Sequence, residues 1–450
     1  MVTNTLQHKS QPNTMKTLAM GYILIILFGS ALLMLPIASK SSEITPFVTA
    51  LFTATSATCV TGLVVVDTYS YWSLFGQLVI LCLIQMGGIG FMTFAIGALT
   101  FTDKRIGLRQ RGLIQDSLNV PQLGGIVRMT RFILLGSIII EAAGAALLSI
   151  RFIPQMGAAQ GIYFAIFHAV SAFCNAGFDL MGYFSPFISF CGYAEDVLVN
   201  VVLMVLIVIG GIGFLVWADV FHHGYHLKKM TLHSKIVILT TAVLIVGGIV
   251  LFLVFEIGGD VSEGKSVGDN LLWAAFQSIV PRTAGFNSIN LTALSSSSIL
   301  LIIILMVIGG SSGSTAGGIK TSTFAVLLLC MRSEIKQRKH IYCMGRRIDD
   351  AVLRRVCCIV IVYLLAIFSA TLSICSIESL PLTEVMFEAA SAIGTVGLSL
   401  GITAQLCSAS QIILILLMYV GRVGCLAILL AVTHNTLVSS KMPVENIKVG

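Results

Sequence analysis

The sequence predicts an all-α polytopic membrane protein with eight transmembrane helices and four re-entrant half-helices, arranged with fourfold pseudo-symmetry around one axis. Two observations predict this class. Of the 450 residues, 56% are apolar and only 10% are charged, and the mean hydropathy is +0.97. A soluble domain cannot hide that much apolar surface, so the surrounding solvent must be mostly lipid. The second observation is a short segment that occurs four times at nearly even spacing.

Eight apolar stretches are long enough to span a bilayer, which takes about 20 residues. They cover about residues 17–38, 74–100, 132–150, 197–221, 236–255, 298–331, 356–375 and 411–436. The N-terminus is polar and shows no small-residue cleavage site, so we expect no removable signal peptide.

The repeated segment starts from a Phe, closes on a Gly and lies between two long apolar stretches. Its copies read LFTATSATCVTGL (51–63), IFHAVSAFCNAGF (166–178), AFQSIVPRTAGFN (275–287) and MFEAASAIGTVGL (386–398). The closing glycines are separated by 115, 108 and 112 residues: Gly62, Gly177, Gly285 and Gly397. Each copy is too short and too polar to span a bilayer. A span, half-span, glycine loop and span, repeated four times, is how one chain can build a pore around a single axis.

The stretches after the glycine loops repeat as well. They read QMGGIGF (85–91), VIGGIGF (208–214), VIGGSSG (307–313) and YVGRVGC (419–425). A single glycine pair in an apolar helix is often a close-packing site, but four at equivalent positions indicate equivalent inner helices. The predicted organisation is an N-terminal tail, four pore repeats and a C-terminal tail. Its boundaries are 1–16, 17–103, 104–224 (with a basic lead-in), 225–345 (with a broken inner helix), 346–436 and 437–450.

The basic residues predict that both termini are cytoplasmic. Of 27 Lys and Arg residues, 21 lie in the two tails and in the connections after the second, fourth and sixth spans. Acidic residues gather in the other connections, where they either concentrate cations at a pore mouth or simply form a solvated surface that avoids positive charge. The net charge of +7 is therefore a topology signal, not evidence for nucleic acid.

The glycine loops have the chemistry of an ion filter. Half-helices are expected over about 46–58, 160–173, 270–281 and 383–393. Glycine adopts positive φ, so each loop can turn successive carbonyls inward to replace an ion's hydration shell. The C-terminal ends of the half-helices would favour a cation. Each loop contributes one closing glycine, which predicts few well-defined carbonyl sites. The candidate filter residues are Cys59, Val60, Thr61, Gly62, Cys174, Asn175, Ala176, Gly177, Thr283, Ala284, Gly285, Gly394, Thr395, Val396 and Gly397.

The sixth span is interrupted by ten small residues that cannot stay helical. We interpret the interruption as a loop that enters the space below the filter and gates the path there, with a passive kink as the alternative. It lacks the Gly-Lys adjacency of a phosphate-binding loop. Arg422 is expected to bind the loop carbonyls, and Lys320 either assists it or snorkels to the cytoplasm. The candidate gate residues are Gly309, Gly310, Ser311, Ser312, Gly313, Ser314, Thr315, Ala316, Gly317, Gly318, Lys320 and Arg422.

Other polar groups within the spans are few. Glu141 is interpreted as pairing with a neighbouring helix rather than binding an ion, and the eleven cysteines as small apolar residues. No Ser/His/Asp set, His-Glu-x-x-His motif or carboxylate pair lies within the spans, which argues against an intramembrane enzyme. His168 is interpreted as a polar residue that satisfies its own half-helix. A secondary transporter built from inverted repeats is disfavoured, because these repeats run in the same direction.

These motifs resemble the Trk/Ktr/HKT superfamily of potassium transporters over about residues 17–436, and eight spans are similar to the bacterial Ktr membrane subunit. The resemblance implies potassium uptake across the plasma membrane, sodium-dependent in several members, with no cofactor in the chain. It also implies a homodimer and a cytoplasmic ring of nucleotide-binding RCK subunits. By this likeness the four closing glycines match the filter, and residues 309–318 with Arg422 match the gate.

Two alternatives stay open. Sodium-selective plant relatives replace the first filter glycine by serine, so Gly62 argues for potassium, while a less selective Na/K transporter of the same superfamily is the alternative. The basic segment 332–355 is suited either to a regulatory partner or to anionic membrane lipids.

Overall fold

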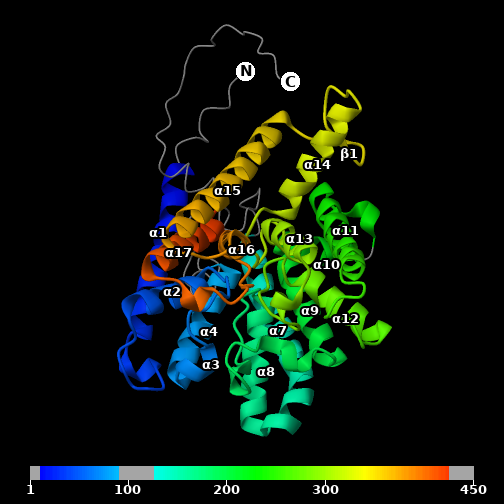
Figure 1. The fold of residues 1–450 in the computed structure, drawn as a ribbon. Coiled ribbons are helices and arrows are strands. Elements are labelled where there is room, and N and C mark those ends of the chain that lie inside the picture. Colours follow the sequence, from blue (N-terminus) through cyan, green and yellow to red (C-terminus); the bar gives the residue numbers. More distant parts are fainter. Residues whose placement is uncertain (1–10, 91–125, 225, 425–450) are drawn as a thin grey trace.

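Helices dominate the computed structural model, which describes residues 11–90, 126–224 and 226–424 (Figure 1). By length and composition, four helices in this part of the chain could cross a membrane, or five if one bent pair counts as a span. The four are α1 (Gln11–Leu33), α7 (Ile126–Met156), α11 (Leu232–Phe255) and α15 (Asp350–Ile377). They coincide with the first, third, fifth and seventh predicted spans.

These long helices turn apolar side chains outward. Only 22 to 33% of the residues in their apolar windows are buried, and Phe28, Ile139, Val243 and Leu372 are exposed. Water does not favour such continuous apolar faces, whereas lipid does.

Four shorter helices occupy the ranges expected for the half-helices. They are α2 (Phe47–Thr58), α8 (Ala158–Phe173), α12 (Val267–Ile279) and α16 (Leu382–Gly394). Each packs against the long helix that precedes it.

Of the four helices that follow the loops, three begin at polar caps and three end at glycines. Helices α4 (Leu74–Ile89), α9 (Val197–Ile212) and α13 (Ser296–Val307) are capped by Ser73, Asp196 and Ser295. Helix α17 (Ser408–Val423) starts without a side-chain cap. Helices α4, α9 and α17 stop at Gly90, Gly213 and Gly424, whose φ angles of 88° to 101° are not helical.

The predicted span over 197–221 is therefore not one straight helix. Helices α9 and α10 (Phe214–His223) are bent by 95° because Gly213 interrupts the helical backbone. The remainders of the predicted spans 74–100 and 411–436, beyond Gly90 and Gly424, lie outside the described residues. The interruption expected in 298–331 is present between α13 and α14 (Thr321–Ile335), and Ile308 and Ile319 form a parallel bridge across its neck.

The helices close into a ring. Helix α4 packs on α8, α9 on α12, α13 on α16, and α17 returns to α2. Figure 1 shows red α17 beside blue α1 and α2, so the last repeat meets the first.

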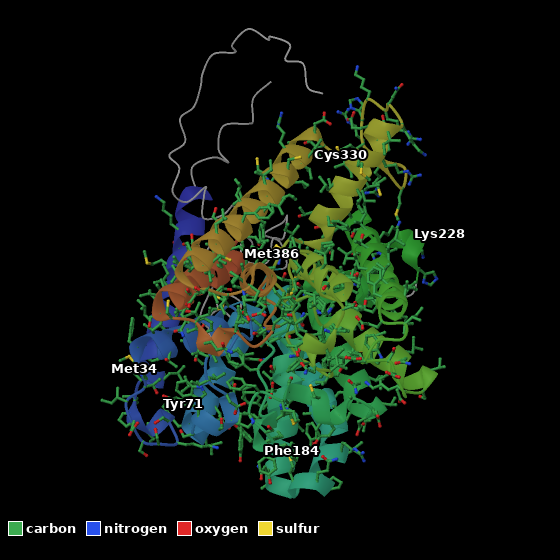
Figure 2. The ribbon with its side chains drawn as sticks, viewed as in Figure 1. Met34, Tyr71, Phe184, Lys228, Cys330 and Met386 are labelled. Carbon is green, nitrogen blue, oxygen red and sulfur yellow. The ribbon has the colours of Figure 1, made fainter. Side chains whose placement is uncertain are left out.

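Cys330 of α14 lies toward one end of the molecule, and Tyr71 and Phe184 lie toward the other (Figure 2). Helix α14, the hairpin of β1 (Tyr342–Cys343) and β2 (Arg346–Arg347), and the start of α15 stand together at the first end (Figure 1). The small elements in the connections are α3 (Thr68–Tyr71), η1 (Pro36–Ala38), η2 (Met181–Tyr183), η3 (Ser189–Tyr193), η4 (Leu227–Lys229), η5 (Leu291–Ala293) and η6 (Thr403–Gln405).

Candidate functional site

The four closing glycines meet in a ring at the centre of the helices. Their φ angles lie between 69° and 93°, a range that favours glycine. A Cβ added to Gly62 would lie 2.5 Å from the carbonyl oxygen of Ala176, and one added to Gly177 would lie 2.8 Å from that of Ala284. A Cβ on Gly285 would meet the Val396 oxygen, and a Cβ on Gly397 would meet the Thr61 oxygen. The order of the ring is thus 62, 177, 285, 397 and back to 62.

One carbonyl from each loop therefore faces the preceding loop of the ring. These are the carbonyls of the residues just before the glycines, and all four residues are buried: Thr61, Ala176, Ala284 and Val396. No described group donates a hydrogen bond to any of these four oxygens. Buried carbonyls are almost always paired, so four unpaired ones in a ring call for a cation or water as their partner.

The backbone just before this ring is strained in the same way in every loop. The residue two positions before each glycine has φ between 51° and 77°: Val60, Asn175, Thr283 and Thr395. Side chains rarely adopt this region, and each such residue costs about 1–3 kcal/mol. A strained turn at the same position of four loops indicates a functional requirement for this carbonyl geometry.

Serines at the ends of the half-helices hold the loops from behind. Ser56 Oγ accepts from the Gly62 N–H at 3.1 Å, and Ser391 Oγ accepts from the Gly397 N–H at 3.1 Å. Ser171 Oγ donates to the Phe178 carbonyl at 2.7 Å. The third loop differs, because its serine lies one residue farther from the glycine. Ser278 Oγ instead donates to the Ile245 carbonyl in α11 at 2.8 Å.

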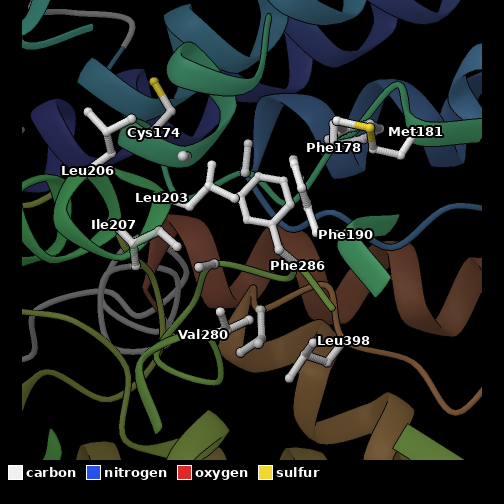
Figure 3. Close-up of a cluster of buried hydrophobic side chains, with 14 of the residues drawn as sticks. Cys174, Phe178, Met181, Phe190, Leu203, Leu206, Ile207, Val280, Phe286 and Leu398 are labelled. Carbon is white, nitrogen blue, oxygen red and sulfur yellow. The ribbon is translucent and has the colours of Figure 1, made fainter. Parts of the chain in front are cut away.

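The side chains beside the glycines point away from the ring. The apolar residue after each glycine is buried: Leu63, Phe178, Phe286 and Leu398. Figure 3 shows Phe178, Phe286 and Leu398 within a packed apolar cluster, where the Phe286 ring lies edge-on to Phe190 at 5.4 Å. The Cys174 thiol also points outward, donating to Gln85 Oε1 at 3.4 Å. Cys59 is fully buried in the apolar cluster on α16 and α17.

The interrupted sixth span places a loop against the ring and the bend at Gly213. The Ser311 N–H donates to the Gly211 carbonyl at 2.9 Å, and the Phe214 N–H donates to the Gly313 carbonyl at 2.8 Å. Thr315 Oγ1 donates to the Phe173 carbonyl at 3.2 Å. A Cβ on Gly317 would collide with the side chain of Thr395, so the loop lies directly against the fourth filter segment.

The neck of the loop is closed by its own residues. The Thr321 N–H donates to the Gly310 carbonyl at 3.0 Å, and the hydroxyls of Ser311 and Thr321 are 2.9 Å apart. The residues at the tip of the loop are only partly buried: Ser312, Gly313 and Ser314.

Arg422 binds the loop, as expected, and a second element that was not expected. Its Nη1 donates to the Thr315 carbonyl, and its Nη2 donates to the carbonyls of Gly87 and Gly88, the latter at 3.2 Å. Gly87 and Gly88 lie in the last turn of α4, where carbonyls lack helical partners. One guanidinium therefore ties the loop of the third repeat to the inner helix of the first.

Lys320 also serves the loop. Its Nζ donates to the Ala316 carbonyl at 2.7 Å and to the Gly317 carbonyl at 3.3 Å. The alternative in which this side chain snorkels away is wrong, because the ammonium folds back onto its own loop.

Glu141 pairs with a neighbouring helix. Gln85 Nε2 in α4 donates to both carboxylate oxygens at 3.0 Å, and Gln85 Oε1 accepts from the Cys174 thiol. Helix α7 is thus connected through α4 to the second loop. Among the described residues, no group of three or more His, Cys, Asp or Glu side chains could hold a metal ion.

Sequence reasoning considered His168 but not the set of buried polar groups to which it belongs. Each half-helix carries a polar residue directly after its Phe: Thr53, His168, Gln277 and Glu388. Aligning the four copies on this Phe reveals the position.

Comparison with known proteins agrees with this architecture. A family model described as "TrkH: Cation transport protein" matches residues 2–440. The "Potassium/sodium uptake protein NtpJ" of Enterococcus hirae is 40% identical over 449 residues, covering 96% of each chain. The "Ktr system potassium uptake protein B" of Bacillus subtilis is 37% identical over 414 residues, covering 91% of this chain and 90% of the relative.

A solved structure shares the fold. The potassium transporter TrkH from Vibrio parahaemolyticus superposes with a TM-score of 0.74 at 19% identity, over 96% of this chain and 87% of that one. The fold and the comparisons define a multi-pass membrane transport protein, not an enzyme. The chain belongs to the TrkH family of cation transport proteins, which confirms the resemblance found in its motifs.

Proposed function

We propose that this chain is the ion-translocating subunit of a potassium uptake system in the cell membrane. One observation carries the proposal: four buried, unpaired carbonyls, from Thr61, Ala176, Ala284 and Val396, each face a closing glycine of the neighbouring loop in one closed ring. Carbonyl oxygens replace the hydration shell of a monovalent cation. Relatives with 40% and 37% identity are named for potassium or sodium uptake, in keeping with this chemistry.

The dipoles of the half-helices add a negative electrostatic potential at the ring. All four end immediately before their glycine loops, so their C-terminal ends approach the ring. A helix C-terminus carries about −0.5 elementary charge, which favours a cation. The negative ends of the half-helix dipoles and the carbonyl oxygens of the ring thus both favour a cation.

The proposed path has four repeats around one axis, with eight spans and both termini in the cytoplasm. The four long helices form the outer spans, and α4, α9 with α10, α13 with α14, and α17 contribute the inner spans. The repeat boundaries are those predicted from the sequence.

The loop over 309–318 is the proposed gate. It touches the fourth filter segment through Gly317 and is held by Arg422 and Lys320. Releasing the Arg422 contacts would free the loop from the first inner helix and open the path.

A less selective Na/K transporter is the second candidate function. It is favoured by the single closing glycine of each loop and by the name of the Enterococcus hirae relative. Glycine rather than serine at position 62 favours potassium, and sodium would then act as an activator.

The proposed assembly is a homodimer that binds a cytoplasmic RCK-type ring. Exposed basic residues between α14 and the hairpin and on the hairpin itself, such as Arg338 and Arg347, offer a contact surface for such a subunit or for anionic lipid.

The test is growth and ion uptake in a potassium-auxotrophic host that expresses the chain with and without an RCK subunit. Potassium uptake that exceeds sodium uptake is expected, with added sodium raising its rate. Equal uptake of both ions would favour the second candidate, and no uptake of either ion by correctly inserted protein would refute both.

A further inference from the structure

The buried polar residue after each half-helix Phe divides the four repeats into two pairs. Thr53, His168 and Glu388 lie nine residues before their closing glycines, and Gln277 lies eight residues before its own. All four are buried, so each needs a hydrogen-bond partner or leaves a polar group unsatisfied. Only His168 and Glu388 form hydrogen bonds with residues that follow the closing glycine of their loop.

Glu388 reaches across the fourth loop. Its Oε1 accepts from the Ser399 hydroxyl and from Thr403 Oγ1, the latter at 3.0 Å. Ser399 is the second residue after Gly397, and its Oγ also accepts from the Gly401 N–H at 2.9 Å. The carboxylate thus ties α16 to the segment that leaves the ring.

His168 does the same in the second repeat. Its Nε2 accepts from the Leu180 N–H at 3.0 Å, three residues after Gly177. Its Nδ1 lies 2.7 Å from the Phe164 carbonyl and must carry the proton, because a backbone N–H can only donate. The neutral ring is enclosed by aromatic side chains, with Phe190 at 5.0 Å. The interpretation from the sequence, that His168 satisfies its own half-helix, accounts for the hydrogen bond at Nδ1 but not for the one at Nε2.

The other two positions make no such tie. Thr53 Oγ1 donates to the Thr49 carbonyl of its own helix. Neither amide atom of Gln277 has a partner among the described residues. Since the ring runs 62, 177, 285, 397, the tied loops lie opposite each other, and so do the untied ones.

We propose that Glu388 and His168 are positioning residues, which hold two opposite loops of the carbonyl ring at a fixed distance from their half-helices and thereby set its ion preference. The inference rests on the proposed function of the ring. Without these ties the carbonyls of Val396 and Ala176 could move inward around a smaller ion. Sodium would then compete, while the maximal rate would change little.

The experiment is potassium uptake into liposomes by the purified chain, with sodium as competitor. Glu388→Leu and His168→Leu should each strengthen sodium competition by about tenfold, the order expected when hydrogen bonds to a buried polar group are lost. Glu388→Gln and His168→Gln keep an acceptor at the required place and should stay within about twofold of the wild type. Gln277→Leu and Thr53→Val, at the equivalent positions, are the matched controls and should leave the preference unchanged.

Two further variants keep the inference testable if the leucine variants fail to fold. Ser399→Ala combined with Thr403→Val removes both donors with little change in volume and should reproduce the effect of Glu388→Leu. Gly62→Ser in the same assay tests the ring itself. If Gly62→Ser alters the preference and the tie variants do not, the positioning role is refuted and the filter stands. If Gly62→Ser has no effect, the filter is refuted. Equal shifts in the Gln277→Leu control, or a Glu388→Gln variant that behaves like Glu388→Leu, would also overturn the positioning role.

Discussion

The glycine ring and the loop beside it are built on opposite plans. The ring takes one strained turn, one glycine and one carbonyl from every repeat, so its four sides are nearly equivalent. The loop over 309–318 comes from the third repeat alone. It contacts Gly211 of the second repeat and Arg422 of the fourth, and Arg422 in turn binds Gly87 and Gly88 of the first. A symmetric ring suits coordination of a spherical ion, whereas a single movable element suits a gate. The comparison predicts that changes in the ring alter which ion passes, and changes around the loop alter how fast it passes.

The largest effect is expected in the ring. Gly62→Ser places a Cβ 2.5 Å from the Ala176 oxygen in a backbone region that serine avoids. Potassium affinity should fall by about tenfold or more, and sodium should begin to compete. The measurement is competitive uptake in liposomes. Gly192→Ser is the matched control, because a Cβ there meets no atom within 4 Å. Unchanged potassium affinity and ion preference in Gly62→Ser would show that the glycine ring is not the ion filter.

The next effect is expected at the loop, and in rate rather than preference. Deleting residues 311–315 should leave a leaky pore, and Arg422→Gln should act in the same direction because it removes the donors to Thr315, Gly87 and Gly88. The double variant should not exceed the larger single effect, since both changes release one element. Potassium flux from liposomes measures this, with exposed Arg332→Gln as the control. Wild-type flux after the deletion, in protein that elutes as a single species, would mean that the loop is no barrier. Strictly additive effects on potassium flux would show that Arg422 acts independently of the loop.

A smaller effect is expected behind the second loop, and in stability. Glu141→Leu leaves the Gln85 amide of α4 without its acceptor, which should cost about 1–3 kcal/mol. Thermal unfolding in detergent should begin a few degrees lower, while potassium preference should change little. Glu141→Gln keeps an acceptor and should behave like the wild type. A gain of sodium transport in Glu141→Leu would instead make this carboxylate part of the ion path.

The smallest effect is expected from labels on the connections, which test orientation without disturbing function. In a background without the exposed Cys82, Cys358 and Cys407, cysteines at positions 43 and 263 should react only from outside, and one at 338 only from the cytoplasm. Position 103 serves the same purpose but lies outside the described residues. Reaction at 338 from outside would reverse the orientation.

Sequence reasoning located the symmetric part of the molecule better than the asymmetric part. The four glycines and the bounds of the half-helices could be predicted because each signal occurs four times and must fit one geometry. The contact of Arg422 with the loop followed from the cost of a lone charge in a span.

The bend at Gly213 could not be predicted, because a glycine in an apolar run serves close packing and helix breaking equally well. The contacts of Arg422 with Gly87 and Gly88 were missed, because every residue has a backbone carbonyl and the sequence does not show which of them accepts a hydrogen bond. Glu388 was overlooked and the Nε2 contact of His168 was missed, because these hydrogen bonds reach loops whose path only the fold defines.

In the proposed filter, one cation is held by four carbonyls, one from each repeat. The most direct measurement is anomalous diffraction from crystals of the full chain grown with rubidium, which replaces potassium. The account predicts a peak at the centre of the ring, within coordination distance of the carbonyl oxygens of Thr61, Ala176, Ala284 and Val396. Gly62→Ser should weaken that peak. Rubidium bound only elsewhere in the chain, with no density inside an intact ring, would contradict the claim.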